Sequence, residues 1–251
     1  MAETALTFKD LSKVYARSHL GRVTRTRGLE GLTLDIPKGE IFGLLGLNGN
    51  GKTTAMKLAL GLLRPTEGQV RVFGSEPGTL DALAHVGYLP ELPYFYPYLS
   101  PREALAFYGR LSRVSSGELR KRIPAVLRQV GLEKAADRKA REFSKGMLQR
   151  LGLAQAVLHK PRLLLLDEPV SGLDPLAVHD VRLLLKELRG QGHTMLLSSH
   201  SISEVEQLCD RVGILVDRRL VKTVEQKDWA GPAGTLERIF VETVRPREEA
   251  A

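Results

Sequence analysis

One short glycine-rich segment constrains this sequence more than any other feature. Residues 46–54 read Gly-Leu-Asn-Gly-Asn-Gly-Lys-Thr-Thr and match the spacing G-x-x-x-x-G-K-[ST] in full. Because they directly follow the apolar run 41–45, they predict the order strand, loop, helix, with the helix beginning near Lys52. In that order, a backbone loop wraps around a phosphate at the N-terminus of a helix. The segment therefore predicts an α/β fold that binds a nucleoside triphosphate.

The residue types in this segment, which we call the phosphate loop (residues 46–54), each suit that task. Gly46 and Gly51 are expected to take positive φ angles, which curl backbone N–H groups around a β-phosphate. Lys52 brings a positive charge to the β and γ oxygens, and the Thr53 hydroxyl is a ligand for Mg²⁺. Further contacts to the triphosphate are expected from the other polar and glycine residues of the loop, namely Asn48, Gly49, Asn50 and Thr54.

The composition is that of an ordinary globular protein. The chain has 251 residues, of which 43% are hydrophobic and 26% charged. No apolar stretch approaches the roughly 20 residues that cross a bilayer, and the first residues lack the pattern of an export signal, so we expect a cytoplasmic protein. The one cysteine, Cys209, excludes an internal disulfide and is predicted to be a packed apolar group.

Basic residues gather near the N-terminus of this chain, whose net charge is +8. The alternation of apolar and polar residues over 4–15 and 32–36 predicts antiparallel strands, and the intervening segment predicts a protruding basic hairpin. Both a solvated loop and a contact with lipid or nucleic acid are compatible with its charge. Between Leu11 and Leu29 the sequence has no acidic residue and five basic ones: Lys13, Arg17, Arg22, Arg25 and Arg27.

The middle of the sequence predicts helices. Ser100-Pro101-Arg102-Glu103 combines an N-cap serine, a proline at the first helical position and a glutamate three residues after the cap, so a helix should begin there. A second helix should end at Gly131. Other expected elements are a helix over 54–63, a strand over 68–74, strands over 163–166, 194–198 and 212–216, and a helix capped by Ser203 and Glu206.

Two adjacent carboxylates follow the leucines at 163–166. Asp167 and Glu168 stand at the C-terminal end of a predicted buried strand, where ligands of open α/β sheets gather. We expect Asp167 to hold magnesium and Glu168 to polarise the water that attacks a γ-phosphate. His200 ends the strand predicted over 194–198, where a neutral imidazole can donate to the γ-phosphate or orient that water. Adjacent acidic residues in other settings are usually solvated, and a lone histidine is more often structural. The place of Asp167, Glu168 and His200 at strand ends favours a catalytic role instead.

Taken in order, the motifs of this chain resemble those of the ATP-binding cassette (ABC) ATPases. The resemblance covers nearly the whole chain and implies an α/β fold: a P-loop NTPase core with a mixed sheet, an N-terminal antiparallel β subdomain and an inserted α-helical subdomain. It implies ATP and Mg²⁺ as cofactors and a dimer that sandwiches two ATP molecules head to tail. The motifs that carry it are the phosphate loop, Phe143–Arg150, Leu163–Glu168, Ser171–Asp174 and His200.

The resemblance also implies roles for residues outside the phosphate loop. Ser144 and Gly146 correspond to residues that cap a helix whose N-terminus meets the γ-phosphate held by the other subunit, in agreement with the preferences of helix N-termini. Asp174 resembles the residue that links the two sites across the dimer. Tyr15 resembles the aromatic residue that stacks on adenine, and a tyrosine packed at a strand end is the alternative.

Three positions depart from the family pattern. Glu91 stands where relatives carry a glutamine that touches the metal and the attacking water; because a carboxylate can ligate magnesium, we expect Glu91 to serve as a metal ligand. Lys145 replaces the first glycine of the signature segment, and Met147 replaces the glutamine that meets the ribose. These changes imply stronger attraction to phosphate and weaker contact with the sugar.

Within the family, segments 87–91, 144–147 and 235–240 resemble the separate ATPase subunits of prokaryotic exporters for drugs, sodium or haem-maturation factors. The resemblance implies an ATPase subunit that dimerises with an identical copy and works at the inner face of the cell membrane with an integral membrane permease. We expect a nucleotide-binding domain over 1–224, with its helical subdomain at about 91–160, and a C-terminal extension over 225–251.

Two other functions remain open. A soluble ATPase that acts on nucleic acid or ribosomes is favoured by the charge, but such relatives usually join two cassettes or insert a long coiled coil, so nucleic acid is not the expected partner. A regulatory subunit with little turnover is compatible with Glu91 and Lys145. A late apolar stripe predicts a helix packed either on its own domain or on a partner: Leu236, Ile239, Phe240 and Val244.

Overall fold

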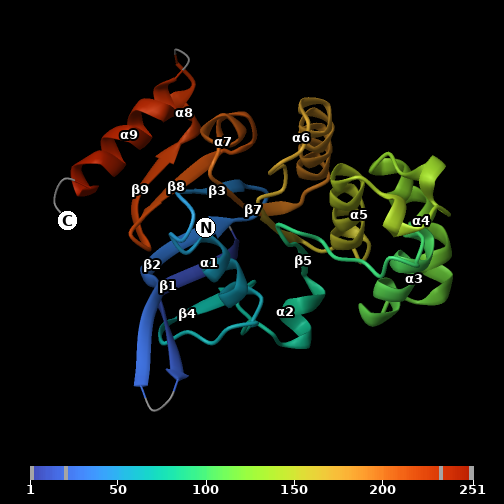
Figure 1. The fold of residues 1–251 in the computed structure, drawn as a ribbon, viewed down its shortest axis with the longest axis horizontal. Coiled ribbons are helices and arrows are strands. Elements are labelled where there is room, and N and C mark those ends of the chain that lie inside the picture. Colours follow the sequence, from blue (N-terminus) through green and yellow to red (C-terminus); the bar gives the residue numbers. More distant parts are fainter. Residues whose placement is uncertain (1–2, 20–21, 232–233, 249–251) are drawn as a thin grey trace. The chain divides into compact units, whose positions relative to one another are not determined.

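The computed structural model describes residues 3–19, 22–231 and 234–248, and Figure 1 shows its ribbon. The chain forms two compact units. One unit, which we call the phosphate-loop unit, contains the residues up to 83 and those from 194 onwards. The other, the middle unit, contains residues 84–193. The short helix α2 (Leu80–Ala84) stands where the chain passes from the first unit to the second.

The N-terminal part of the phosphate-loop unit is an antiparallel sheet, as predicted. Its strands are β1 (Thr4–His19), β2 (Arg22–Pro37) and β4 (Glu67–Val72), in the order β2-β1-β4. Leu6 and Phe8 on β1 are buried, as the alternating pattern requires. The strand expected over 68–74 is therefore confirmed as β4, one residue earlier at its start and two residues shorter at its end.

The same unit holds a set of strands around the phosphate loop. Strand β3 runs parallel to both β7 and β8, and β9 pairs antiparallel with β8, which makes the sheet mixed, as expected. Every residue of β3 and β7 is buried, which is typical of strands covered on both faces. The bounds are β3 Ile41–Leu45, β7 Thr194–Ser199, β8 Arg211–Val216 and β9 Arg219–Glu225.

Two helix boundaries in this unit differ from the predictions. Helix α1 (Lys52–Ala59) begins where expected, but it ends well before Pro65 because Gly61 takes a φ of 73° and turns the chain. Helix α7 (Ile202–Leu208) already includes Ser203, so the predicted cap at Ser203 was wrong. The helix begins after Ser201, whose backbone N–H donates to Ser199 Oγ at 2.9 Å.

The C-terminal helices complete this unit. Helices α8 (Gln226–Trp229) and α9 (Thr235–Glu248) contact each other, and α9 also contacts α7 and β8. Leu236 is fully buried, whereas Ile239 and Phe240 are half-buried. The apolar stripe of α9 is therefore packed at least in part on its own unit. Cys209 is buried beside Gly43, and burial raises the pKa of its thiol well above the ordinary value, as a packed apolar role requires.

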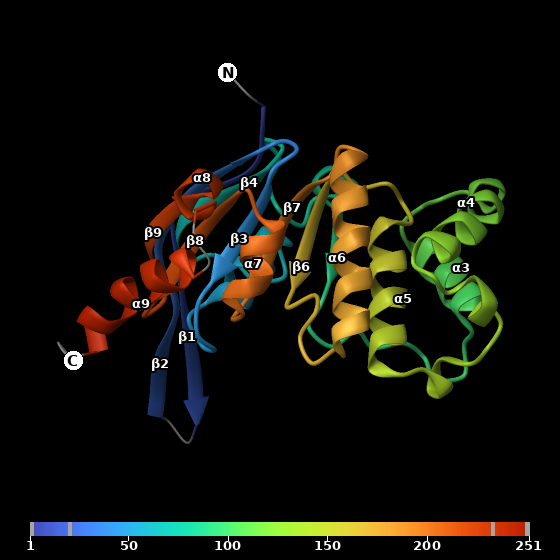
Figure 2. The same ribbon diagram turned by 90° about the horizontal axis from the view of Figure 1, so that it is seen from above.

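The middle unit combines two parallel strands with helices. Leu163–Asp167 forms β6, which is buried throughout and pairs with β5. In Figures 1 and 2, helix α5 lies between α6 and the pair α3 and α4, and the contacts of α3, α4 and α5 agree. The bounds are β5 Val86–Leu89, α3 Pro101–Leu111, α4 Ser116–Gln129, α5 Lys145–Val157 and α6 Pro175–Gly190, with short 3₁₀ turns at Glu133–Ala135 and Ala140–Glu142.

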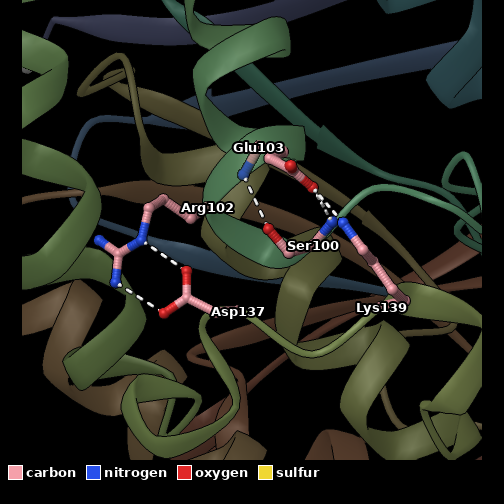
Figure 3. Close-up of polar contacts among 5 residues, drawn as sticks. All are labelled: Ser100, Arg102, Glu103, Asp137 and Lys139. Carbon is pink, nitrogen blue, oxygen red and sulfur yellow. Dashed lines mark hydrogen bonds and ion pairs between the residues drawn. The ribbon is translucent and has the colours of Figure 1, made fainter.

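The start of α3 confirms the predicted capping box (Figure 3). The Glu103 backbone N–H donates to Ser100 Oγ at 3.3 Å, and the Ser100 N–H donates to Glu103 Oε2 at 2.7 Å. Lys139 donates to the same carboxylate at 3.1 Å, and Arg102 donates to Asp137 at 2.9 Å. The N–H of Ser100, followed by Lys139, lowers the pKa of Glu103. These bonds fix the point where the helical part of the middle unit begins.

Candidate active site

The phosphate loop joins β3 to α1 and uses its glycines for two different reasons. Gly49 and Gly51 take φ angles of 84° and 95°, a region that glycine enters without strain. Gly46 does not take a positive φ, so that expectation was wrong. A Cβ at position 46 would instead lie 2.6 Å from the backbone oxygen of Leu215 on β8, so glycine is required there by close packing.

Lys52 is folded back over the loop. It is only 6% exposed, and its Nζ donates to the backbone oxygen of Gly46 at 2.6 Å and that of Leu47 at 3.4 Å. A buried ammonium group requires hydrogen-bond acceptors, and these carbonyl oxygens provide them. Thr53 follows directly and is half-buried. The loop thus holds the Lys52 ammonium group at the N-terminus of α1. Both this positive charge and the helix dipole favour the binding of an anion there.

Other predicted ligands anchor the loop to its surroundings. Asn50 Nδ2 donates to the backbone oxygen of Leu215 at 3.1 Å, which fastens the loop to β8, whereas Asn48 is exposed. Thr54 Oγ1 lies 3.1 Å from the Tyr15 hydroxyl. The structure therefore places Tyr15 beside the first turn of α1. Stacking of its ring on adenine stays a prediction.

Tyr15 is also packed against the hairpin from which it projects. A Cβ at position 28 would collide with the Tyr15 ring, and a Cβ at Gly51 would lie 2.5 Å from the Gly28 backbone oxygen. The ring, the hairpin and the phosphate loop therefore meet around Gly28. Sequence reasoning missed Gly28 because its importance arises from contacts with residues distant in the chain.

His200 follows strand β7, which pairs with β3, the strand that precedes the phosphate loop. The Gly46 N–H donates to the backbone oxygen of Ser199 at 3.4 Å, and Leu45 pairs with Ser199 in the parallel register. His200 follows Ser199 directly and is exposed. The structure therefore brings this predicted residue to the same edge as the start of the loop, as expected for the carboxyl ends of parallel strands.

In the middle unit, Asp167 is the last residue of the buried strand β6, and Glu168 follows it directly. They are 2% and 6% exposed, which is rare for carboxylates. Glu168 has a φ of 49°, an uncommon conformation for a residue with a side chain and one that gathers at functional sites. Burial raises the pKa of Tyr88 on β5 to about 12, and the charge of Asp167 adds to the shift. Glu91, which follows β5, is exposed.

The loop after Glu168 has a support that sequence reasoning did not assign. Gln149 on α5 is 2% exposed, and its Nε2 donates to the backbone oxygen of Pro169 at 2.9 Å. A buried amide with this bond holds the chain just beyond the two carboxylates. The only signal in the sequence was its position within the Phe143–Arg150 motif, which does not reveal its partner.

The start of α5 is brought together with the start of α6 within the middle unit. Ser144 caps α5 as predicted, its Oγ accepting from the Met147 N–H at 3.3 Å, and it is exposed. A Cβ at Gly146 would lie 3.5 Å from Ala177 on α6. Asp174 caps α6, with Oδ1 accepting from the Ala177 N–H at 2.9 Å. The predicted residues Ser144, Gly146 and Asp174 therefore lie in one region.

Lys145 also belongs to this region. Gly172 has a φ of 66°, and a Cβ there would collide with the Lys145 Nζ. The lysine side chain thus lies across Gly172, and the missing side chain of glycine makes room for it. Sequence reasoning noted Lys145 as a departure from the family pattern but did not identify Gly172 as its neighbour.

Each unit carries oxygen donors of the kind that magnesium takes at a nucleotide, rather than the ligand cluster of a metal held by protein alone. Among the residues that the structure describes, no three His, Cys, Asp or Glu side chains gather as a metal site. Magnesium at a nucleotide needs only one or two protein oxygens, because phosphates and waters complete its shell. A threonine hydroxyl in the loop and a buried aspartate at a strand end are donors of that kind. No helix in the described ranges has the length and apolar character of a membrane span.

Comparisons with known proteins agree with these features. Residues 29–171 match the family described as ABC transporter. The chain is 43% identical over 240 residues to an uncharacterized ABC transporter ATP-binding protein of Nostoc sp., covering 92% of this chain and 72% of that protein. It is 37% identical over 224 residues to the bacitracin transport ATP-binding protein BcrA of Bacillus licheniformis, covering 88% and 70%.

A solved structure described as the ATP-binding subunit of an ABC transporter has a TM-score of 0.80 and 31% identity, covering 95% of this chain and 99% of that one. The expected fold class is thereby confirmed. The family match covers more than half of the sequence, and both relatives are more than 30% identical to it over aligned regions that span at least 70% of their own length. The chain therefore belongs to the ABC transporter family, as an ATPase subunit.

Proposed function

We propose that this protein hydrolyses magnesium-bound ATP as one half of a dimer and thereby powers an exporter whose membrane-spanning permease is a separate protein. The observation that carries the hydrolytic part is the buried pair Asp167 and Glu168 at the end of β6, in a chain that also has a complete phosphate loop. The transport part is supported by the similarity to the bacitracin transport protein, and the direction of export by the resemblance of segments 87–91, 144–147 and 235–240 to exporter subunits. The site of action would be the inner face of the cell membrane.

In this proposal the phosphate loop, from Gly46 to Thr54, binds the triphosphate. Lys52 already stands among loop carbonyls, and a phosphate would give its charge a second partner. Thr53 and Asp167, with Glu91 as a further candidate, would hold magnesium, which neutralises charge on the phosphate oxygens when bound. Tyr15 would contact the adenine.

The proposed chemical step relies on two residues. Glu168 accepts a proton from the attacking water and so makes it a better nucleophile. His200 orients that water or donates to the γ-phosphate oxygen. The uncommon backbone conformation of Glu168, with a φ of 49°, is of the kind that gathers at functional sites, which supports a catalytic role for this residue.

The dimer is the finer part of the proposal. Ser144 and Gly146, at the exposed start of α5, would complete the nucleotide site of the other copy, and Asp174 would link the two sites. We propose a nucleotide-binding domain over 1–224, with a helical subdomain at about 91–160, and a C-terminal extension over 225–251. The clustering of Ser144, Gly146 and Asp174 within one region supports a shared role.

The first experiment compares Glu168→Gln with the parent protein in steady-state phosphate release. Loss of a positioned general base should lower turnover by about 10² to 10⁴-fold while ATP binding, measured by calorimetry, is retained. The control is Glu133→Gln, at an exposed glutamate paired with Arg128, which should leave turnover unchanged. Undiminished turnover in Glu168→Gln would remove that residue from the role.

The second experiment is affinity capture from detergent-solubilised membranes. The proposal expects a multispan membrane protein to co-purify and to alter the rate of ATP hydrolysis. Nuclease-sensitive RNA or DNA in place of a membrane protein would instead favour the soluble nucleic-acid function. A chain that binds ATP without measurable phosphate release, even with the captured partner, would favour a regulatory subunit.

A further inference from the structure

A two-stranded ribbon extends from the antiparallel sheet of the phosphate-loop unit. Strand β4 pairs with β1 only as far as Ser12, whereas the pairing of β1 with β2 continues from Val14 opposite Arg27 to His19 opposite Arg22. Figures 1 and 2 show these blue strands running beyond the other strands of their unit. We call residues 14–19 and 22–27 the basic ribbon.

Packing does not explain the length of the basic ribbon. Ala16 and Ser18 are exposed, and so is every residue from Val23 to Arg27. Val23 alone exposes 61% of its surface. A two-stranded ribbon without an apolar core is marginally stable in water. Its persistence in the fold is therefore better explained by a contact that it makes with something else.

The charged residues of the basic ribbon are all positive. Its sequence contains Arg17, Arg22, Arg25 and Arg27 and no acidic residue. The nearest carboxylate in the chain, Glu30, accepts from Arg27 at 3.0 Å and also pairs with Arg219, whose hydrogen bond is the main cause that lowers the pKa of Glu30. One carboxylate shared by two guanidinium groups does not neutralise the ribbon.

The exposed residues also form a pattern. Val23, Arg25 and Arg27 alternate along β2 and so share one face of the ribbon. An exposed apolar side chain flanked by arginines is the composition of segments that lie at the interface of anionic membranes. For single-stranded nucleic acid one expects aromatic side chains that stack on bases. The ribbon's only Phe, Trp or Tyr is Tyr15, which is engaged with Thr54 and Gly28 at the base.

We propose that the basic ribbon binds the surface of an anionic phospholipid membrane through Arg25 and Arg27, with Val23 on the same face entering the headgroup region. The choice of a membrane rests on the proposed function, since a subunit of a transporter works beside a bilayer. The arginines offer planar donors to the phosphate groups of the lipids. This contact with lipid would exist in addition to the contact between the subunit and the permease, and it would not require a bound nucleotide.

The test is sedimentation of the full-length, nucleotide-free protein with vesicles of phosphatidylcholine, with and without phosphatidylglycerol. Binding should require phosphatidylglycerol and should weaken as salt is raised. Each arginine near such a surface contributes about fivefold, so Arg25→Gln/Arg27→Gln should bind about 25-fold more weakly. The single variant Arg25→Gln, which leaves the pair of Arg27 with Glu30 intact, should bind about fivefold more weakly.

The matched control is Arg120→Gln/Lys134→Gln, which removes two exposed positive charges from the middle unit and should retain binding. Equal binding to both kinds of vesicle, or equal loss in the two double variants, would overturn the proposal. The proposal would also be overturned if the parent protein bound a short RNA but not vesicles, and if Arg25→Gln/Arg27→Gln lost that RNA binding. Phosphate release is measured in parallel, so that failure of lipid binding with intact ATP hydrolysis is distinct from failure of the proposed function.

Discussion

Among the helices that the structure describes, α1 and α5 each begin with a lysine, and the two lysines have opposite surroundings. Lys52, the first residue of α1, is 6% exposed and donates to the Gly46 carbonyl oxygen. Lys145, the first residue of α5, is exposed and lies across Gly172. The caps differ in the same sense: the N-cap of α1 is a glycine without a side chain, whereas Ser144 caps α5 through a hydrogen bond.

This difference leaves the start of α1, unlike that of α5, suited to an acceptor from a bound molecule. The first N–H groups of a helix need acceptors, and at α5 the chain provides one from its own N-cap. At α1 the N-cap is Gly51 in the left-handed conformation, which offers none. A bound phosphate is the acceptor that suits such a cap. The start of α5 is stable by itself, and in the proposed dimer it contacts a nucleotide held elsewhere.

The largest effect should come from removing the buried lysine. Lys52→Ala should weaken ATP binding by about 2 to 4 kcal/mol, or roughly 30- to 1000-fold, because it truncates one partner of a buried charged contact. Lys145→Ala, the counterpart at the other helix start, should change the affinity by less than about fivefold, as for an exposed charge. Calorimetry measures the ATP affinity of each variant, and a Glu168→Gln background prevents hydrolysis of the ATP during the measurement. Equal losses would erase the distinction between the two helix starts.

A smaller effect should separate the two left-handed glycines of the phosphate loop. Gly49→Ala adds a Cβ with open space around it, so it should cost only the backbone strain, about 1 to 2 kcal/mol. Gly51→Ala should cost about 1 to 3 kcal/mol more in free energy of unfolding, since its Cβ would also strike the Gly28 carbonyl oxygen. Urea titrations of the two variants give the comparison, and identical stabilities would show that the loop relaxes around residue 51.

The smallest effect is expected at the cap of α5. Ser144→Ala should lower the free energy of unfolding by about 1 kcal/mol because the Met147 N–H loses its acceptor. Ser144→Asp keeps a cap and should keep the stability. Its negative charge should nevertheless reduce ATP hydrolysis if the other copy's phosphate lies nearby. Full activity of a stable Ser144→Asp protein would contradict the proposed contact across the dimer.

Much of the fold followed from local patterns. The spacing around Lys52 predicted a strand, a loop and a helix, and the capping signals at Ser100 and the leucines of 163–166 predicted α3 and β6 correctly. Such features succeed because the physical cause lies within a few residues of the signal. The same holds for the antiparallel pairing of β1 with β2 in the basic segment, where a hairpin was predicted.

Several of the errors and omissions have causes that are distant in sequence, whereas the misplaced end of α1 and the cap of α7 are local errors. The need for glycine at position 46 comes from Leu215, on a strand near the other end of the chain. The bond from Gln149 to Pro169 and the space that Gly172 gives to Lys145 appear only when helices and loops are packed. The end of α1 was misplaced because Gly61 stops the helix before the more conspicuous proline. Sequence motifs thus point to candidate ligand-binding residues more readily than to the residues that support them.

The meeting of Gly51 with Gly28 limits how this sequence can change over evolution. A side chain at position 51 would strike the Gly28 backbone, and a side chain at position 28 would strike the ring of Tyr15. Neither site can accept even a methyl group unless its neighbour shifts. The root of the hairpin, where Gly28 and Tyr15 meet the phosphate loop, must therefore vary in step with the loop that it touches.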